Sequence, residues 1–202
     1  MLNRVTVADI VAEEDRDRAA LYALLGECLQ AAPSQEWLSR VSRITGGDGP
    51  VGAALTEVAG AAGATSAAAV AREYHDRFIG LGRGEFVPYA SYYLTGFLNE
   101  KPLAVLRQAM AELGIERDPA VKEPEDHIAA LCQMMAGLIT GAFGSPLTLA
   151  EQKRFFAAHV GNWASYFFRD LARSPQQGFY PVIGRLGEAF LGVEEQAFAM
   201  VE

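Results

Sequence analysis

Hydrophobic residues recur at helical spacing along most of the chain. Apolar side chains within residues 21–29 fall at i, i+3, i+4, i+7 and i+8, which predicts a helix over about residues 14–31. Pro33 ends this helix, and Ser34 is a candidate N-cap for a short helix through Arg43. The chain shows no convincing pair of strand patterns and no repeat of fixed period. The pattern therefore predicts an all-α fold, a helical bundle of about eight to ten helices.

The middle of the chain is rich in alanine, which favours helix. Residues 53–71 contain ten alanines, and Gly60 with Gly63 indicates a break between two helical pieces. Ser91 is a candidate cap for a short helix. A longer helix is predicted over Lys101–Leu113, because apolar residues recur there on one face.

A polar connector over residues 114–122 is the best candidate boundary between two helical blocks. We therefore expect an N-terminal helical block over residues 1–113, a hinge over residues 114–122 and a C-terminal helical block over residues 123–202. Such a hinge permits exchange of blocks between copies, so both a monomer and a domain-swapped dimer are compatible with the sequence.

Three long helices are predicted in the C-terminal block. The first runs from Pro124 to about Ile139. The second starts at Thr148, which has capping-box spacing to Glu151, and bends at Gly161-Asn162. The last covers about residues 180–197.

Composition excludes a disordered chain and argues against nucleic acid as a partner. Half of the 202 residues are hydrophobic and a tenth are aromatic, enough for a substantial core in one domain or two small ones. With a formal net charge of −8, the chain lacks the basic face that displaces counterions from a phosphate backbone. The same charge permits a basic partner, although most acidic proteins are simply soluble.

Cysteine use and hydropathy favour the cytoplasm. The two cysteines, Cys28 and Cys132, lie within apolar helical patterns and make neither a disulfide framework nor a zinc site. No stretch of about 18 apolar residues is present, so no stable membrane insertion is expected. Residues 1–10 lack the apolar core of a secretion signal, and residues 1–12 are expected to form a loose lead-in.

The segment Glu123-Pro124-Glu125-Asp126-His127 concentrates charge at the expected start of a helix. Pro124 fits the first helical position, which places Glu125 and Asp126 in the first turn, beside free N–H groups and the positive end of the helix dipole. Asp126 then points nearly opposite to the apolar stripe, while His127 lies at its edge. Two interpretations stay open: the carboxylates serve the helix start, or this exposed corner binds a cationic segment.

No catalytic or metal-binding constellation stands out. The glycines of residues 80–84 follow a helix and lack the terminal Gly-Lys-Ser/Thr of a phosphate cradle. No His-x-x-x-His or Cys-x-x-Cys pair is present, so neither a metal nor another cofactor is expected. No serine or cysteine carries a nucleophile signature. His159 lies in mid-stripe between Phe156 and Trp163, where an interior role is favoured over a ligand role.

Four motifs, in the same order along the chain, resemble those of a family of cytoplasmic redox-enzyme maturation chaperones, the TorD/DmsD type related to NarJ. Residues 74–80 resemble a family segment that ends in Phe-x-Gly, and residues 88–93 resemble its Pro-Pro-Tyr-x-Ser-x-Tyr loop. Residues 123–127 match its diagnostic string, Glu-Pro-Asp/Glu-Asp-His. Residues 156–163 resemble a later Phe-x-x-His-Leu-x-x-Trp pattern. The resemblance covers most of the chain.

The resemblance implies an all-helical chaperone, not an enzyme. Such proteins bind the twin-arginine leader and the apo form of a molybdopterin oxidoreductase catalytic subunit, assist cofactor insertion and delay export until maturation. Clients of the formate dehydrogenase, DMSO/TMAO reductase or nitrate reductase type all fit. A NarJ-like assembly factor that binds the subunit independently of its leader is the main alternative, and a nucleotide-binding hydrolase is a weaker one.

The resemblance also implies which side chains contact the leader. Val87, Ala90 and Val160 depart from the family's usual residues at the loop and the later pattern. Carried over position by position, the expected leader-binding residues are Asp126, His127, Glu123, Tyr89, Tyr93 and Trp163.

Overall fold

The computed structural model describes residues 12–80 and 84–201, and within these ranges the chain is helical, with no strand beyond a single isolated bridge. The expected all-α fold is confirmed. Most of the predicted lead-in over residues 1–12, and residues 81–83 of the glycine segment, lie outside the described residues. The helices are α1 (Glu13–Gln30), α2 (Gln35–Val41), α3 (Gly49–Gly63), α4 (Ala67–Tyr74) with a π-helical turn (His75–Ile79), α5 (Ala90–Thr95), α6 (Lys101–Glu112), α7 (Ile128–Thr140), α8 (Leu149–His159), α9 (Ala164–Ala172) and α10 (Phe179–Ala199).

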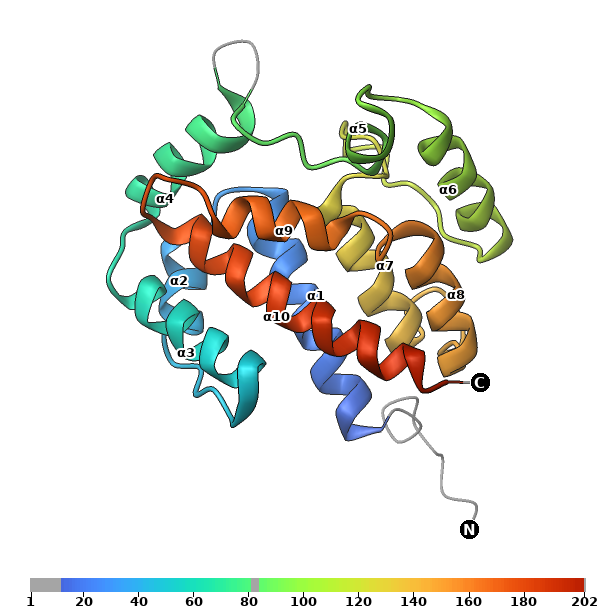
Figure 1. Cartoon of the computed structure of the whole chain (residues 1–202), viewed down its shortest axis with the longest axis horizontal. Helices are drawn as coiled ribbons and strands as arrows, with labels where there is room; N and C mark the ends of the chain where they lie inside the picture. Colours follow the sequence, from blue (N-terminus) through green and yellow to red (C-terminus); the bar gives the residue numbers. More distant parts are fainter. Residues whose placement is uncertain (1–11, 81–83, 202) are drawn as a thin grey trace.

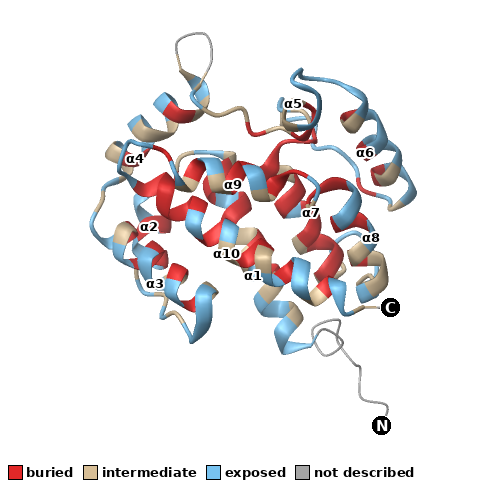
Figure 2. Cartoon of the chain, viewed as in Figure 1, coloured by how far each residue is buried: buried red, intermediate tan, exposed pale blue. Residues whose placement is uncertain are grey.

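One hydrophobic core joins both halves of the chain. α1 lies against α7, and α10 packs against both α9 and α3 (Figure 1). Buried residues line the facing sides of these helices, including Tyr22 of α1 and Phe190 of α10, whose rings meet edge to face at 4.7 Å (Figure 2). The connector over residues 114–122 is an irregular link between α6 and α7. The division into blocks at this connector stays a prediction.

Two predicted helix starts are confirmed by side-chain caps. Ser34 Oγ accepts a hydrogen bond from the Trp37 N–H at 3.1 Å, which satisfies a free donor at the start of α2. Thr148 and Glu151 form the reciprocal capping box of α8. These caps involve residues three apart in sequence, so the amino-acid pattern alone specifies them.

Three expectations about the helices are wrong. α7 starts at Ile128, not at Pro124, because His127 has extended backbone and occupies the N-cap position. The predicted helix that bends at Gly161-Asn162 is instead two helices, α8 and α9. The Gly161 N–H donates to the Phe156 carbonyl at 2.8 Å, and a Cβ at Gly161 would lie 2.6 Å from the Phe156 ring, so the chain turns closely over that ring. Ser91 does not cap α5, because Tyr89 holds its N-cap position; the Ser91 Oγ instead accepts a hydrogen bond from the Glu100 N–H, just before α6, at 3.3 Å.

Helices α5 and α6 form an arm at one end of the molecule, which we call the α5–α6 arm (residues 90–112) (Figure 1). Leu103, Leu106 and Met110 are the buried residues of α6. The turn between the two helices has positive φ at Gly96 (84°) and at Asn99 (59°), a conformation that asparagine tolerates better than most residues. The arm therefore ends in a tight turn that carries Phe97 and Leu98.

Length and hydropathy decide whether a helix in the described part of the chain could cross a membrane. No single helix there is both long and apolar enough to cross a membrane. One pair, α3 with Ala67–Ile79, meets the length and composition test only as two pieces bent by 112°.

Candidate functional site

Two short segments, distant in sequence, pair next to the α5–α6 arm. The Ala90 N–H donates to the Asp126 carbonyl at 3.0 Å, and the Ile128 N–H donates to the Pro88 carbonyl at 2.9 Å. Tyr89 and His127 thereby form an isolated antiparallel bridge. We call this the paired segments (residues 88–90 and 126–128). Because α5 starts at Ala90 and α7 at Ile128, the last residue of each segment, the pairing fixes the two helix starts relative to each other.

The carboxylate of Asp126 caps α5 from 35 residues away. Its Oδ2 accepts a hydrogen bond from the Ser91 N–H at 2.8 Å, a free donor in the first turn of α5. Asp126 is only 1% exposed, and its Oδ1 has no hydrogen-bond partner within the described residues. A buried acceptor without a partner is unusual in folded proteins, and this oxygen has almost no solvent-accessible surface, so the carboxylate serves α5 and not an exposed contact.

His127 caps α7 with its own ring. Nδ1 accepts a hydrogen bond from the Ala129 N–H at 3.1 Å, and the residue is 5% exposed. Burial lowers the pKa of His127 to about 4, so the imidazole is neutral near pH 7, as an accepting Nδ1 requires. The Tyr89 ring packs edge-on against it, with centroids 4.9 Å apart. The expectation of an exposed carboxylate and imidazole is therefore wrong, because Asp126 and His127 each cap a helix inside the protein.

Glu125 ties the start of α7 to α6 and to the connector. Its carboxylate accepts from Arg107 of α6 at 2.8 Å and lies 3.6 Å from Arg117. The Arg117 guanidinium also donates to the carbonyls of Val121 and Lys122. Burial alone would raise the pKa of Glu125, but the hydrogen bond and charge of Arg107, with the charge of Arg117, lower it. Glu125 is thus ionised and already paired with two arginines, so its carboxylate is not available to bind a partner.

The other predicted site residues fall into two groups. Near the paired segments, the Tyr89 hydroxyl donates to the exposed carboxylate of Glu123. On the other side of α5, the Tyr93 ring lies 5.4 Å from Trp163, and its hydroxyl donates to Asp170 at 3.3 Å. Trp163 is a core residue whose indole N–H donates to the His159 carbonyl at 2.9 Å. Of the six predicted residues, four surround the paired segments, while Tyr93 and Trp163 pack apart from them.

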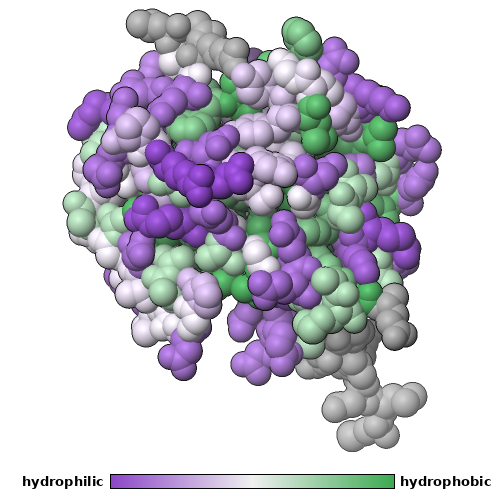
Figure 3. Space-filling view, in the orientation of Figure 1, coloured by the Kyte–Doolittle hydropathy of each residue, from purple (hydrophilic) through white to green (hydrophobic). Residues whose placement is uncertain are grey.

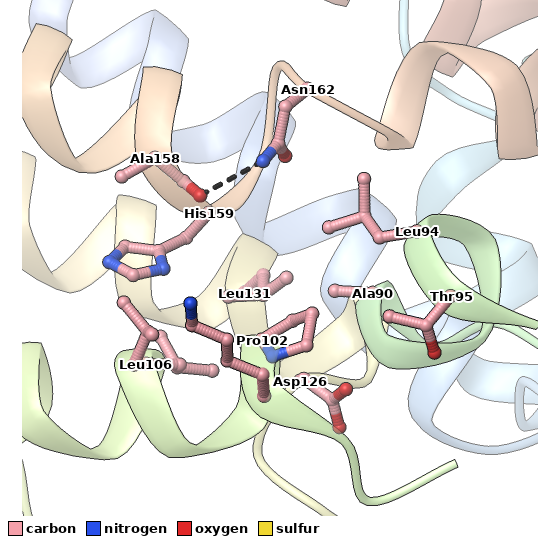
Figure 4. Close-up of a pocket in the computed structure, with 12 residues that line it drawn as sticks. Ala90, Leu94, Thr95, Pro102, Leu106, Asp126, Leu131, Ala158, His159 and Asn162 are labelled. Atoms are coloured by element: carbon pink, nitrogen blue, oxygen red, sulfur yellow. Dashed lines mark hydrogen bonds between the residues drawn. The ribbon is translucent and has the colours of Figure 1, made fainter. Parts of the chain in front are cut away.

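A cavity of about 290 Å³ opens between the α5–α6 arm, α7 and the end of α8. Asp126 lies on one side of it and His159 on the other, with Leu131 of α7 between them (Figure 4). The Asn162 amide at its edge donates to the Ala158 carbonyl at 3.1 Å. The lining is mostly apolar: Ala90, Leu94, Thr95, Lys101, Pro102, Val105, Leu106, Asp126, Leu131, Ala158, His159 and Asn162.

Sequence reasoning missed this cavity, apart from Asp126. Leu106 was assigned to a helix face and His159 to the interior, and both sit at the cavity wall. Burial lowers the pKa of His159, so it presents a neutral ring there. Leu94 and Val105 lie at the opening of the cavity and are 42% and 47% exposed, which is high for apolar residues. Exposure depends on how the helices pack, so the sequence does not show it.

The described part of the chain shows neither a metal-binding cluster nor a reactive cysteine. No group of three or more His, Cys, Asp or Glu side chains there has a geometry that would hold a metal ion. Cys28 and Cys132 are buried, and burial raises the pKa of both thiols, which keeps them protonated and unreactive. The cavity offers a ligand mainly apolar contact.

Comparison with known proteins identifies the family. A model of the family described as nitrate reductase delta subunit matches residues 46–169. This range is more than half of the chain and includes both paired segments. The chain belongs to this family. The resemblance seen in the sequence motifs is thereby confirmed.

Curated members of the family are named chaperone protein TorD. The chain is 30% identical to TorD of Vibrio cholerae serotype O1 (strain O395) over 129 residues, 60% of this chain and 59% of the relative. It is 28% identical to TorD of Vibrio atlanticus over 135 residues, 63% of both chains. The match therefore spans about three fifths of these relatives' length.

A solved structure shares the fold. It is the crystal structure of a protein from Archaeoglobus fulgidus proposed to act in redox enzyme maturation, with a TM-score of 0.56 and 18% sequence identity. The match covers 88% of this chain and 93% of the other. The shared fold thus extends over most of the chain.

We expect Asp126→Ala and Asp126→Asn to differ in their effect on stability. Alanine leaves the buried Ser91 N–H without an acceptor, which costs about 1–3 kcal/mol of unfolding free energy. Asparagine keeps an oxygen for that N–H, so most of the stability should remain. Urea unfolding followed by circular dichroism measures both. Equal losses in the two variants would show that the cap does not stabilise α5.

We expect His127 to make the protein less stable in mild acid. Its folded pKa of about 4 lies below the ordinary 6.5, so the unfolded state binds more protons between these values. Stability is complete above pH 6.5 and falls by roughly 3 kcal/mol as the pH drops to about 4. His127→Asn, which offers a cap but no titration, should lose this part of the pH dependence. Matching urea midpoints of the two proteins at every pH would contradict the assignment.

Proposed function

We propose that the protein is a cytoplasmic maturation chaperone for a redox enzyme. It holds the apo form of a molybdopterin oxidoreductase catalytic subunit and binds the twin-arginine leader of that subunit. By doing so it gives time for cofactor insertion and delays export. Membership of the nitrate reductase delta subunit family and the TorD name of the curated relatives support this proposal. Clients of the formate dehydrogenase or DMSO/TMAO reductase type fit it.

The observation that carries the proposal is the apolar cavity beside the α5–α6 arm, with Asp126 in its wall. A twin-arginine leader has a basic start and an apolar middle. An acidic protein (net charge −8) attracts the first part, and the apolar cavity suits the second. Of the motif segments that carry the family resemblance, three supply a residue to the lining of this cavity: Ala90, Asp126 and His159.

The six predicted leader-binding residues take different roles in this proposal. Asp126 forms part of the cavity wall against which the leader packs, and exposed Glu123 offers a carboxylate to the basic start of the leader. Tyr89 links these two positions through its contacts with Glu123 and His127. His127, Tyr93 and Trp163 shape the site from inside, since each is tied up by packing.

A NarJ-like assembly factor is the second candidate. Such a factor grips the body of the subunit independently of its leader. The family description and the exposed apolar residues of the α5–α6 arm, outside the cavity, favour it. The two candidates differ in which part of the client they need.

Calorimetry distinguishes these candidates. We expect the purified protein to bind synthetic leaders of the molybdopterin enzymes encoded in the same genome. The control is a leader of scrambled sequence and equal charge, which should bind at least tenfold more weakly, about 1.4 kcal/mol. The leaderless apo subunit is the second titrant. Binding to that subunit with none to any leader would reject leader recognition and favour the NarJ-like candidate.

A further inference from the structure

Helix α6 is loosely held against the rest of the protein. Among the described helices it packs closely only against α5, whereas α7 lies along α1 and α9 along α10. Its buried residues are Leu103, Leu106 and Met110, while Val105 and the neighbouring Phe97 remain exposed. Hydrophobic side chains accordingly gather on the surface over α5 and α6, in the upper right of Figure 3. Only part of the apolar surface of α6 is therefore used to hold it in place.

Three cavities separate α6 from the body of the protein. The first, of about 290 Å³, is the cavity that Asp126 lines. The second, of about 230 Å³, lies between α6 and α8, and the third, of about 170 Å³, lies between Met110, α7 and the connector. Protein interiors are normally packed as densely as organic crystals, so side chains beside such gaps lose dispersion contacts. Moving α6 therefore costs less free energy than moving a helix of the core.

The floor of the first cavity is closed while α6 stays in place. Leu106 of α6 and Leu131 of α7 line this cavity from opposite sides, yet they are only 1% and 0% exposed. A molecule larger than water therefore cannot touch Leu131 in this arrangement. Access to the floor requires α6 to move.

Both ends of α6 can absorb a change of direction. The turn before α6 holds Gly96 and Asn99 at positive φ, and Gly114, which follows the C-cap of α6, has a φ of 67°. A Cβ at Gly96 or at Gly114 would meet no atom within 4 Å, so both positions have open space around them. Residues of this kind at the ends of an element are typical hinges of mobile lids.

One ion pair fastens α6 to the segment before α7. The Arg107 guanidinium donates to Glu125 Oε2 from Nη2 at 2.8 Å and from Nε at 3.0 Å. In the described part of the chain, no other side chain of α6 makes an ion pair or hydrogen bond outside the helix. Arg117 lies 3.6 Å from the same carboxylate. Glu125 therefore keeps a cationic partner when Arg107 leaves, which avoids the large cost of an unpaired buried charge.

We propose that α6 is a lid that turns about Gly96–Asn99 and Gly114, with the Arg107–Glu125 ion pair as its latch. His159 lines both the first and the second cavity, so lifting α6 joins them into one groove along α8. Because Leu131 becomes accessible only then, the lid controls when the groove can take up a ligand. This role goes beyond the proposed function, since it concerns access to the site and not the identity of a ligand.

Thiol labelling detects the opening of the lid. The native Cys28 and Cys132 are buried, so a new cysteine is observed against a slow background. Leu131→Cys places a thiol under α6, and Leu186→Cys makes the same change in α10, at a residue that is also 0% exposed. Each labelling rate is divided by the rate that global unfolding of that variant allows, which urea unfolding provides. We expect a maleimide to label Leu131→Cys at a corrected rate roughly tenfold or more above that of Leu186→Cys.

A second matched pair of variants tests the latch in the Leu131→Cys protein. Arg107→Gln removes the ion pair with Glu125, and Arg185→Gln removes an ion pair of similar length, 2.7 Å, between α10 and Glu57 of α3. We expect Arg107→Gln to raise the labelling rate about fivefold and Arg185→Gln to change it by less than about twofold. In Arg107→Gln, the amides of α6 should exchange hydrogen faster while those of α7 and α10 stay unchanged. A general loss of stability would not produce this local effect.

The outcomes separate the lid, its latch and the proposed function. Equal corrected rates for Leu131→Cys and Leu186→Cys, or amides of α6 as protected as those of α7 in the wild type, overturn the lid. Equal effects of Arg107→Gln and Arg185→Gln overturn the latch. Neither measurement uses a leader or a client, so failure of the lid is distinguishable from failure of the proposed function.

Discussion

The hydrogen-bonded pairing of residues 88–90 with residues 126–128 is the interaction on which the rest of the site depends. It brings two helix starts together and lets each side chain of the Asp126-His127 dipeptide cap a different helix. The α5–α6 arm is held at its base by this pairing and along α6 by Glu125 and Arg107. The cavity exists because the arm stands off α7 and α8 at this position.

Burial changes what these charges can do in the protein. A carboxylate on an exposed helix start would be screened by water and worth little in binding. Asp126 is instead enclosed, so its hydrogen bond with the Ser91 N–H is stronger than the same bond in water. A variant that removes this side chain removes the cap of α5 and part of the cavity wall together.

The helices could largely be predicted from the sequence, because helical spacing and caps such as Ser34 and Thr148 act within a few residues. The start of α7 could not be predicted, because a proline followed by acidic residues, as at Pro124, is also typical of the first turn of a helix. Asp126 caps α5 instead, and the N–H that it accepts belongs to Ser91, 35 residues away in sequence. The cavity was equally hidden, because periodicity assigns Val105 to a face but does not say whether another helix covers it.

The long sequence separation within the paired segments has a consequence for how the protein is made. Closing a loop of 35 residues costs roughly 3 kcal/mol of chain entropy, which only the contacts of the completed pair offset. While the chain is being synthesised, α5 therefore lacks its cap until residue 128 has left the ribosome. A truncated product that ends in the connector therefore has the residues of the arm but neither Asp126 nor the second of the paired segments, which holds the base of the arm.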